Sequence, residues 1–295
     1  MSYGNYVIIT PVRNEEEFIN DTIQSVISQT VRPRVWIIVN DGSTDRTRDI
    51  IEQYLDDHPW IRVIDKEDRG FDAVSRAELV AFNEALRGLE FKDWEYVVKL
   101  DGDVHMEKDY FEVLLSRFQE DASMGIGGGI SFGKLHDSYR EEKMPDFHPW
   151  SGARMYRRAC FDEIGGLPDF LGGETIDILN AHMKGWETKS FRDLKVLHLR
   201  IMSSRSGLWE GKIRTGKIFY ITGYHPLFLI ARSIFRIRVR PYHIETFGVM
   251  YGYFKAMLNR ESRVVTPEQV RFLRRQQLRR LFTGKLLIND REASS

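Results

Sequence analysis

Residues 6–16 read YVIITPVRNEE, a β-branched run that passes directly into a polar segment. Tyr6–Thr10 has the composition of a buried strand, and apolar residues between 18 and 27 then recur at helical spacing. Asn14, with Glu17 three residues later, predicts a capping box for that helix. Three more strand-like runs follow, at Val35–Asn40, Ile61–Asp65 and Tyr96–Leu100. This alternation predicts an α/β fold with a mostly parallel central sheet flanked by helices.

Length and composition exclude several classes of protein. The chain has 295 residues, of which 42% are hydrophobic and 29% charged, so a disordered or fibrous protein is disfavoured. Its single cysteine, Cys160, cannot form an internal disulfide, which favours a reducing compartment and a core position for that thiol. The N-terminus lacks the charged and apolar regions of a signal peptide, so we expect a cytoplasmic protein.

Charge divides the chain into two parts although the total is zero. Residues 205–295 hold 18 Lys and Arg against 6 Asp and Glu, a net charge of +12, and residues 1–204 carry −12. We therefore expect a catalytic domain over 1–204 and a helical, basic extension over 205–295. The extension could meet anionic lipid, nucleic acid or the acidic domain, or its charges could be solvated or paired internally.

Polar segments follow three of the predicted strands, where ligands bind in open α/β sheets. They are Pro11–Glu16, Asn40–Asp45 and the triplet Asp101-Gly102-Asp103. Two aspartates on a sheet edge can bind magnesium or manganese and leave positions open for phosphate oxygens. The glycine run at 125–129 has the wrong spacing for a dinucleotide fingerprint, which favours close backbone packing or a flexible turn there.

These motifs, together with Gly165-Gly166, resemble family 2 glycosyltransferases in order and spacing over roughly residues 5–200. The resemblance implies a GT-A fold, with a nucleotide-binding half over 1–103 and an acceptor half over 104–204, and a transfer that inverts the anomeric centre. It further implies a nucleotide site that includes Pro11, Arg13, Glu15, Asp41 at the base, Arg76, Asp101 and Gly102, and a metal site that includes Asp101 and Asp103.

The sequence offers two candidates for the general base. Family members usually carry a Glu-Asp pair after a glycine-rich stretch, whereas residues 172–177 read GGETID and Thr175 takes the place of the aspartate. Glu174 and Asp177 lie three residues apart on one face of the predicted helix, so either could reach the acceptor. We favour Glu174, which lies nearer the glycine loop. Both could instead be acids that stabilise a helix start.

Three further residues are candidates on the acceptor and metal side. His198 follows a strand-like run at the position where many GT-A enzymes supply a histidine ligand, although a lone histidine is often structural. Trp150 and Gly152 lie in a segment that resembles the acceptor side of the family. Trp150 could stack on a sugar ring or pack in the core.

Two segments of the basic extension are candidates for contacts with other molecules. Residues 216–237 form an apolar, aromatic segment too short to span a membrane, which suits an interfacial helix, a buried helix or a dimer contact. Residues 271–281 combine arginines with apolar residues at helical spacing. Docking of that helix on a membrane surface and packing against the acidic domain are both consistent with the pattern.

The sequence thus predicts a metal-dependent inverting glycosyltransferase that uses Mn²⁺ or Mg²⁺ and a UDP- or GDP-linked sugar. We expect a glycan or polyprenyl-linked acceptor at the cytoplasmic face of the membrane, and no nucleic acid. A nucleotidyltransferase that makes sugar nucleotides is the first alternative, although Pro11–Glu16 lacks its usual glycine-rich basic loop. A non-catalytic scaffold that binds lipid or nucleic acid through the basic extension is the second, and Thr175 is its main support.

Overall fold

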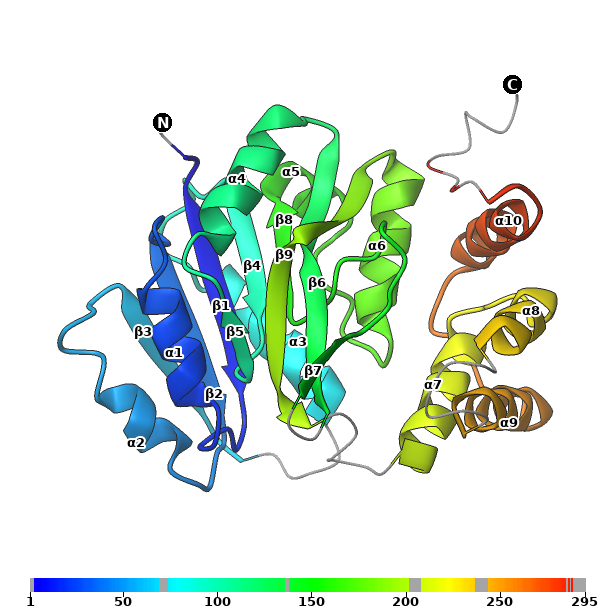
Figure 1. The fold of residues 1–295 in the computed structure, drawn as a ribbon, viewed down its shortest axis with the longest axis horizontal. Helices are drawn as coiled ribbons and strands as arrows, with labels where there is room; N and C mark the ends of the chain where they lie inside the picture. The colour runs from blue at the N-terminus through cyan, green and yellow to red at the C-terminus, as the bar shows by residue number, and fades with distance from the viewer. Residues whose placement is uncertain are drawn as a thin grey trace. The chain divides into compact units, whose positions relative to one another are not determined.

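The computed structural model describes residues 3–68, 74–135, 138–201, 208–236 and 244–284, together with 286 and 288 (Figure 1). The chain divides into two compact units. Unit 1 comprises residues 1–181 and 186–202, and unit 2 comprises residues 182–185 and 203–295.

The first half of the sheet in unit 1 is parallel. Its strands are β1 (Tyr6–Val12), β2 (Val35–Asp41), β3 (Ile61–Lys66) and β4 (Tyr96–Leu100). β1 lies between β2 and β4, and β3 pairs with β2. All four strands predicted from the sequence are confirmed, and the carboxyl ends of β1, β2 and β4 meet at one edge of the sheet as the parallel pairing requires.

The second half of the sheet is mixed. Across the sheet the strands run β3-β2-β1-β4-β8-β6-β9-β5, and β7 pairs with β6. β8 joins β4 in the antiparallel sense, and β9 pairs parallel with β6 and antiparallel with β5. These strands are β5 (Val104–Met106), β6 (Met124–Leu135), β7 (Ser138–Glu141), β8 (Ala153–Arg157) and β9 (Glu187–Ile201).

Helices cover both faces of this sheet because successive residues of its buried strands point to opposite sides. Ile8 and Trp36 belong to the core under α1 (Ile19–Ile27), α2 (Thr47–Glu52) and α4 (Tyr110–Glu120). Val7 and Ile9 belong to the core on the other face, with residues of α3 (Val74–Arg87), α5 (Arg158–Glu163) and α6 (Gly173–Lys184). Unit 1 is therefore a three-layer α/β structure, as predicted.

Two local predictions from the sequence have different outcomes. The capping box is wrong, because α1 has no side-chain cap. Asn14 instead has a φ of 53° and its side chain accepts a hydrogen bond from the Thr44 backbone at 2.8 Å, joining two loops. Close packing of the glycine run is confirmed within β6, since a Cβ on Gly129 would lie 2.4 Å from the carbonyl oxygen of Leu194.

Unit 2 is helical. Its helices are α7 (Leu208–Ile221), α8 (Pro226–Arg236), α9 (Ile244–Leu258) and α10 (Pro267–Thr283). The apolar segment predicted over 216–237 lies on two helices, because the chain turns at Gly223, which has a φ of 86°, and restarts at Pro226. On α10 the apolar residues Phe272 and Leu273 are buried, whereas Leu281 and Phe282, near the end of the helix, are exposed. Within the described ranges, no helix is long and apolar enough to cross a bilayer.

Candidate active site

The loops after β1, β2 and β3 are held together by one arginine. Arg13 donates a hydrogen bond to the Asp41 carbonyl oxygen at 3.2 Å and forms an ion pair with Asp68 at 2.6 Å. Asp41 is buried at the end of β2, with 6% of its surface exposed. Two residues predicted for the nucleotide site, Arg13 and Asp41, therefore lie together at the edge of the sheet.

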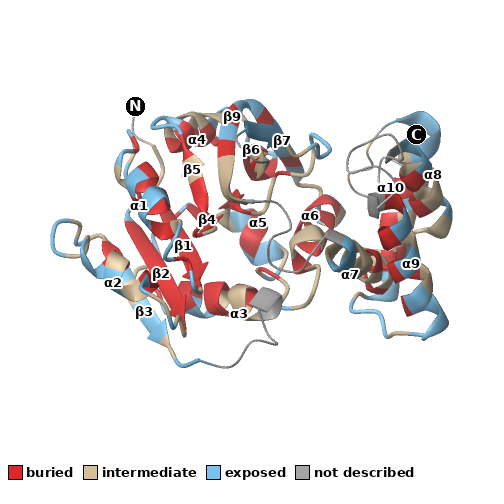
Figure 2. Cartoon of the chain, turned by 60° about the horizontal axis from the view of Figure 1, so that its bottom comes forward, coloured by how far each residue is buried: buried red, intermediate tan, exposed pale blue. Residues whose placement is uncertain are grey.

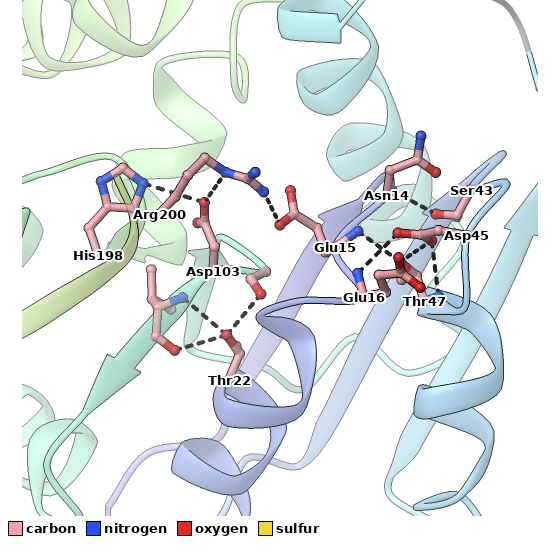
Figure 3. A network of polar contacts seen from close by, with 12 residues as sticks. Asn14, Glu15, Glu16, Thr22, Ser43, Asp45, Thr47, Asp103, His198 and Arg200 are labelled. Carbon is pink, nitrogen blue, oxygen red and sulfur yellow. Dashed lines mark hydrogen bonds and ion pairs between the residues drawn. The ribbon is translucent and has the colours of Figure 1, made fainter. Parts of the chain in front are cut away.

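A second set of contacts ties the β1 loop to the start of α2 (Figure 3). The Glu15 backbone donates to the Thr47 hydroxyl at 2.7 Å, and the Glu16 backbone donates to Asp45 at 3.1 Å. Asp45 also accepts from the Thr47 backbone at 3.0 Å. Hydrogen bonds between side chains and backbone therefore hold the β1 loop and the segment before α2 together at the ends of the strands. We call these two segments the rim.

Thr22 on α1 fixes the triplet Asp101-Gly102-Asp103. Its hydroxyl donates to the Gly102 carbonyl oxygen at 2.9 Å and accepts from the Val104 backbone at 3.0 Å (Figure 3). Gly102 has no room for a side chain, because an added Cβ would lie 2.7 Å from Val12. This role of Thr22 was not predicted, because a buried threonine in an amphipathic helix looks like a core residue.

Asp103 lies in a nearly buried position between two basic side chains. Its Oδ2 is 3.0 Å from Arg200 Nε and 3.4 Å from His198 Nε2, and Arg200 also pairs with Glu15 (Figure 3). Burial opposes ionisation of Asp103, but His198 and Arg200 outweigh it and keep its pKa below the usual value. Asp103 and His198, both predicted as metal ligands, lie close together in the structure. Arg200 was not predicted.

His198 reaches Asp103 because β9 pairs with β5, which places it opposite Val104. Burial disfavours the imidazolium, but the carboxylates of Asp103, 3.4 Å away, and Glu142, 3.9 Å away, prevail and raise the pKa of His198 to about 10. In the absence of other cations, the carboxylates therefore hold this side chain protonated.

Two of the three predicted metal ligands, Asp103 and His198, lie close together. Asp103, just before β5, could offer an oxygen, and His198 on β9 could offer a nitrogen once its proton is displaced, a donor set suited to manganese. Asp101 instead bonds to Lys99 at 2.7 Å. Among the described residues, no group of three or more His, Cys, Asp or Glu side chains is arranged to hold a metal. In the structure, Arg200 and His198 supply the positive charge beside the nearly buried Asp103 carboxylate.

Lys99 on β4 links the first aspartate of the triplet to α3 and α6. Its ammonium is 1% exposed and lies 2.6 Å from Glu78, 2.7 Å from Asp101 and 3.1 Å from Glu174. Burial opposes ionisation of Glu174, but Lys99 and Arg154 outweigh it and hold the pKa of Glu174 below the usual value. Glu174 is thus a carboxylate beside Asp101. Lys99 was missed, because nothing in the run YVVKL shows which groups a lysine will meet.

Asp177 pairs with a different basic residue from the one that binds Glu174. Its side chain is 0% exposed and accepts hydrogen bonds from Arg154 and Tyr156, both at 2.6 Å. Burial raises the pKa of Asp177, although both partners oppose that shift. Arg154 also donates to the Glu174 carbonyl oxygen at 2.8 Å. Asp177 therefore acts within the structure as a partner that fixes the start of α6.

Trp150 and Gly152 lie against the metal-side residues. The Trp150 and His198 ring centroids are 5.2 Å apart, and Gly152 accepts a hydrogen bond from the Asp101 backbone at 2.8 Å. A Cβ on Gly152 would lie 2.2 Å from the Trp150 ring, so a side chain there would displace the tryptophan. Of the remaining nucleotide-site candidates, Pro11 is buried on β1, and the Arg76 side chain lies outside the described residues.

Comparison with known proteins agrees with this arrangement of loops and strands. The sequence profile of Glycosyl transferase family 2 matches residues 7–167, which is more than half of the chain. The chain belongs to glycosyl transferase family 2. The matched region contains β2, β3 and β4, all of β1 except Tyr6, the β1 and β2 loops and the triplet at 101–103.

Curated relatives of this family 2 chain are named as glycosyltransferases or as a chondroitin synthase. It is 30% identical to glycosyltransferase GlyA of Streptococcus pneumoniae over 145 residues, which are 46% of this chain and 19% of that protein. It is 29% identical to chondroitin synthase of Escherichia coli over 207 residues, 66% of this chain and 28% of that protein. The putative teichuronic acid biosynthesis glycosyltransferase TuaG of Bacillus subtilis is 38% identical over 113 residues, 38% of this chain and 41% of TuaG. The chain thus spans less than half the length of these relatives.

Solved structures similar to this family 2 chain share its fold. The mannosyltransferase PcManGT of Pyrobaculum calidifontis, in complex with GDP-Man and Mn²⁺, superposes with a TM-score of 0.55 at 15% identity, covering 96% of this chain and 82% of that one. Residues 1–349 of TarS from S. aureus give a TM-score of 0.54 at 16% identity, covering 93% and 77% of the two chains. The mixed α/β architecture is therefore that of GT-A glycosyltransferases.

Proposed function

We propose that this chain transfers a sugar from a nucleoside-diphosphate sugar, UDP- or GDP-linked, with inversion to a glycan or polyprenyl-linked acceptor. One observation carries the proposal: the β1 loop, the β2 loop and the triplet after β4 lie at one sheet edge in a family 2 chain. PcManGT was solved with GDP-Man and TarS with UDP-GlcNAc, which supports a donor of that class.

The donor's nucleoside would lie against the β1 and β2 loops. Asp41, held in place by its carbonyl bond to Arg13, would accept a hydrogen bond from the base. The loop contacts at Glu15 and Glu16 orient this rim before the donor arrives, which reduces the entropy lost on binding. Pro11 and Arg76 complete the proposed nucleotide site.

Asp103 and His198 would hold a Mn²⁺ or Mg²⁺ ion, with Asp101 as a further proposed ligand. When bound, such an ion supplies Lewis-acid stabilisation of the diphosphate leaving group. In the structure described here, Arg200 supplies positive charge at the same carboxylate, 3.0 Å from Asp103. We propose that Arg200 stays near the diphosphate, where a guanidinium binds phosphate oxygens well.

Glu174 is the proposed general base. It would take the proton from the acceptor hydroxyl as that oxygen attacks the anomeric carbon and the bond to the diphosphate breaks. Its ion pair with Lys99 keeps it ionised and ties it to Asp101, so base and donor site are fixed by one side chain. Asp177 is a poorer candidate because it is fully buried against Arg154. Trp150 would offer its ring to an acceptor sugar.

A transfer assay tests the proposal. The full chain is incubated with a panel of UDP- and GDP-sugars and Mn²⁺, and release of nucleoside diphosphate is measured with and without EDTA. The proposal expects release from at least one donor, loss of release with EDTA, and a fall of about a hundredfold or more in Glu174→Gln. Release that survives both EDTA and Asp103→Ala would remove the metal mechanism. Pyrophosphate release from a nucleoside triphosphate and a sugar phosphate would favour the nucleotidyltransferase.

A further inference from the structure

Helix α9 of unit 2 carries apolar residues on its outer side as well as its inner side. Tyr251 is 51% exposed, Leu258 78% and Phe247 57%. At 100° per residue these positions fall within one narrow arc of the helix, and the partly exposed Met250 and Phe254 lie beside it on one side. We call this set, Phe247, Met250, Tyr251, Phe254 and Leu258, the α9 stripe. Figure 2 shows both exposed and buried residues on α9.

The inner side of α9 is fixed against α7, so the stripe cannot turn inward. A Cβ on Gly252 would lie 2.0 Å from the Ile213 carbonyl oxygen, and one on Gly216 would lie 2.0 Å from the Val249 carbonyl oxygen. The two backbones therefore touch, and Val249 and Tyr253 are buried beside them. Rotation of α9 would destroy this backbone contact.

An aromatic residue of α7 extends the stripe. Trp209 is 46% exposed and stacks on Tyr251 with ring centroids 6.5 Å apart. Tryptophan and tyrosine rings are enriched at the interface between water and lipid, where one side of the ring is apolar and the other is hydrated. An apolar row bordered by such a pair has the composition of an interfacial helix.

Basic residues border the same row. The Lys255 ammonium lies 5.7 Å from the Tyr251 ring centroid, and the exposed Arg260 follows Leu258 by two residues. Residues 205–295 as a whole carry 18 Lys and Arg against 6 Asp and Glu. A second copy of this chain would bring the same positive charge to the contact, whereas an anionic bilayer would bring the opposite charge.

We propose that the α9 stripe and Trp209 insert into the surface of an anionic lipid bilayer, with α9 parallel to the membrane plane. The helix has 15 residues, or about 22 Å at 1.5 Å per residue, which is shorter than the roughly 30 Å apolar core of a bilayer. The inference deepens the proposed function, on which it rests for the lipid-linked acceptor. It places the lipid contact on α9, whereas on α10 Phe272 and Leu273 are buried and only Leu281 and Phe282, near its end, are exposed.

Vesicle sedimentation with the full chain tests the inference. Vesicles of phosphatidylcholine with about a quarter phosphatidylglycerol are compared with pure phosphatidylcholine. We expect binding to the anionic vesicles, weakened about tenfold or more in Tyr251→Glu/Leu258→Glu because two large apolar groups no longer enter the bilayer. The matched control, Ile64→Glu/Tyr139→Glu, makes the same charge change at two exposed apolar positions of unit 1 and should bind as the unchanged chain does. The serine pair Tyr251→Ser/Leu258→Ser replaces the glutamate pair if thermal melts show that it is unfolded.

Three outcomes would overturn the inference. The first is failure of the unchanged chain to bind anionic vesicles. The second is equal binding by the stripe variants and the control. The third is a concentration-dependent dimer in sedimentation velocity without lipid that the stripe variants abolish, which would assign the stripe to self-association. Release of nucleoside diphosphate from the donor in lipid-free buffer is measured in parallel. It depends on unit 1 chemistry alone, so a failure of the transferase proposal is seen separately from a failure of vesicle binding.

Discussion

Replacing Asp177 with asparagine removes one partner of a fully buried ion pair while keeping the size of the side chain. Asp177 and Arg154 are both 0% exposed and 2.6 Å apart, so the substitution leaves a guanidinium in the core without its counter-charge. Breaking such a pair costs about 3–5 kcal/mol of folding free energy. For a unit of this size, each kcal/mol lowers the melting temperature by about 2–4 °C, so we expect a fall of about 6–20 °C.

The measurement combines unfolding with kinetics. Thermal and urea unfolding are recorded for Asp177→Asn, and kcat is measured at a temperature where the variant is still folded. Replacing both partners, as Arg154→Met/Asp177→Leu, should restore most of the lost stability, since two apolar groups can fill a buried ion-pair site. Glu174→Gln is the opposite case, with a nearly unchanged melting temperature and kcat lowered about a hundredfold or more. If Asp177→Asn keeps its melting temperature and loses kcat to that extent, Asp177 is the base and our assignment is wrong.

Three other perturbations test parts of the account. Thr22→Val keeps the shape of the side chain but removes the hydroxyl that bonds Gly102 and Val104. We expect the free energy of unfolding in urea to fall by about 1–3 kcal/mol and donor binding to weaken. Unchanged values for both would mean that Thr22 is only a core residue. Gly252→Ala places a Cβ 2.0 Å from the Ile213 carbonyl oxygen and should lower the stability of unit 2 by about 1–3 kcal/mol in a thermal melt. An unaltered melt would contradict the close contact of α7 and α9. Burial raises the pKa of the Cys160 thiol to about 12, so Ellman's reagent at about pH 8 should react with it only after denaturation. Fast reaction of the folded protein would show that the thiol is accessible.

The first half of the fold could be predicted because its signals are local. Tyr6–Val12 and Val35–Asp41 are buried along their whole length, so each reads as a continuous apolar run. Parallel pairing then brings Asp41 and Asp101 to one edge of the sheet without further information. The mixed second half depends on partners far apart in sequence, such as β5 with β9.

Sequence order and spacing predicted which residues lie near the site, but not which side chains those residues contact. Glu174 and Asp177 share a helix face by spacing, yet one meets Lys99 and the other meets Arg154. Both partners are charged residues in strands, whose surroundings are set by distant elements. Arg200 and Thr22 were not predicted for the same reason. Arg200 contacts Asp103, which is 97 residues away in the sequence, and Thr22 contacts Gly102, which is 80 residues away.

Calorimetric titration of UDP and GDP in Mn²⁺ tests the central claim most directly, namely that the Asp103 site binds a donor diphosphate with a metal. We predict that at least one nucleotide binds the unchanged chain, that EDTA abolishes the binding, and that Asp103→Ala weakens it by about tenfold or more, as expected when a close charge interaction is lost. Absence of binding by both nucleotides, or equal binding by Asp103→Ala with and without EDTA, would contradict the account.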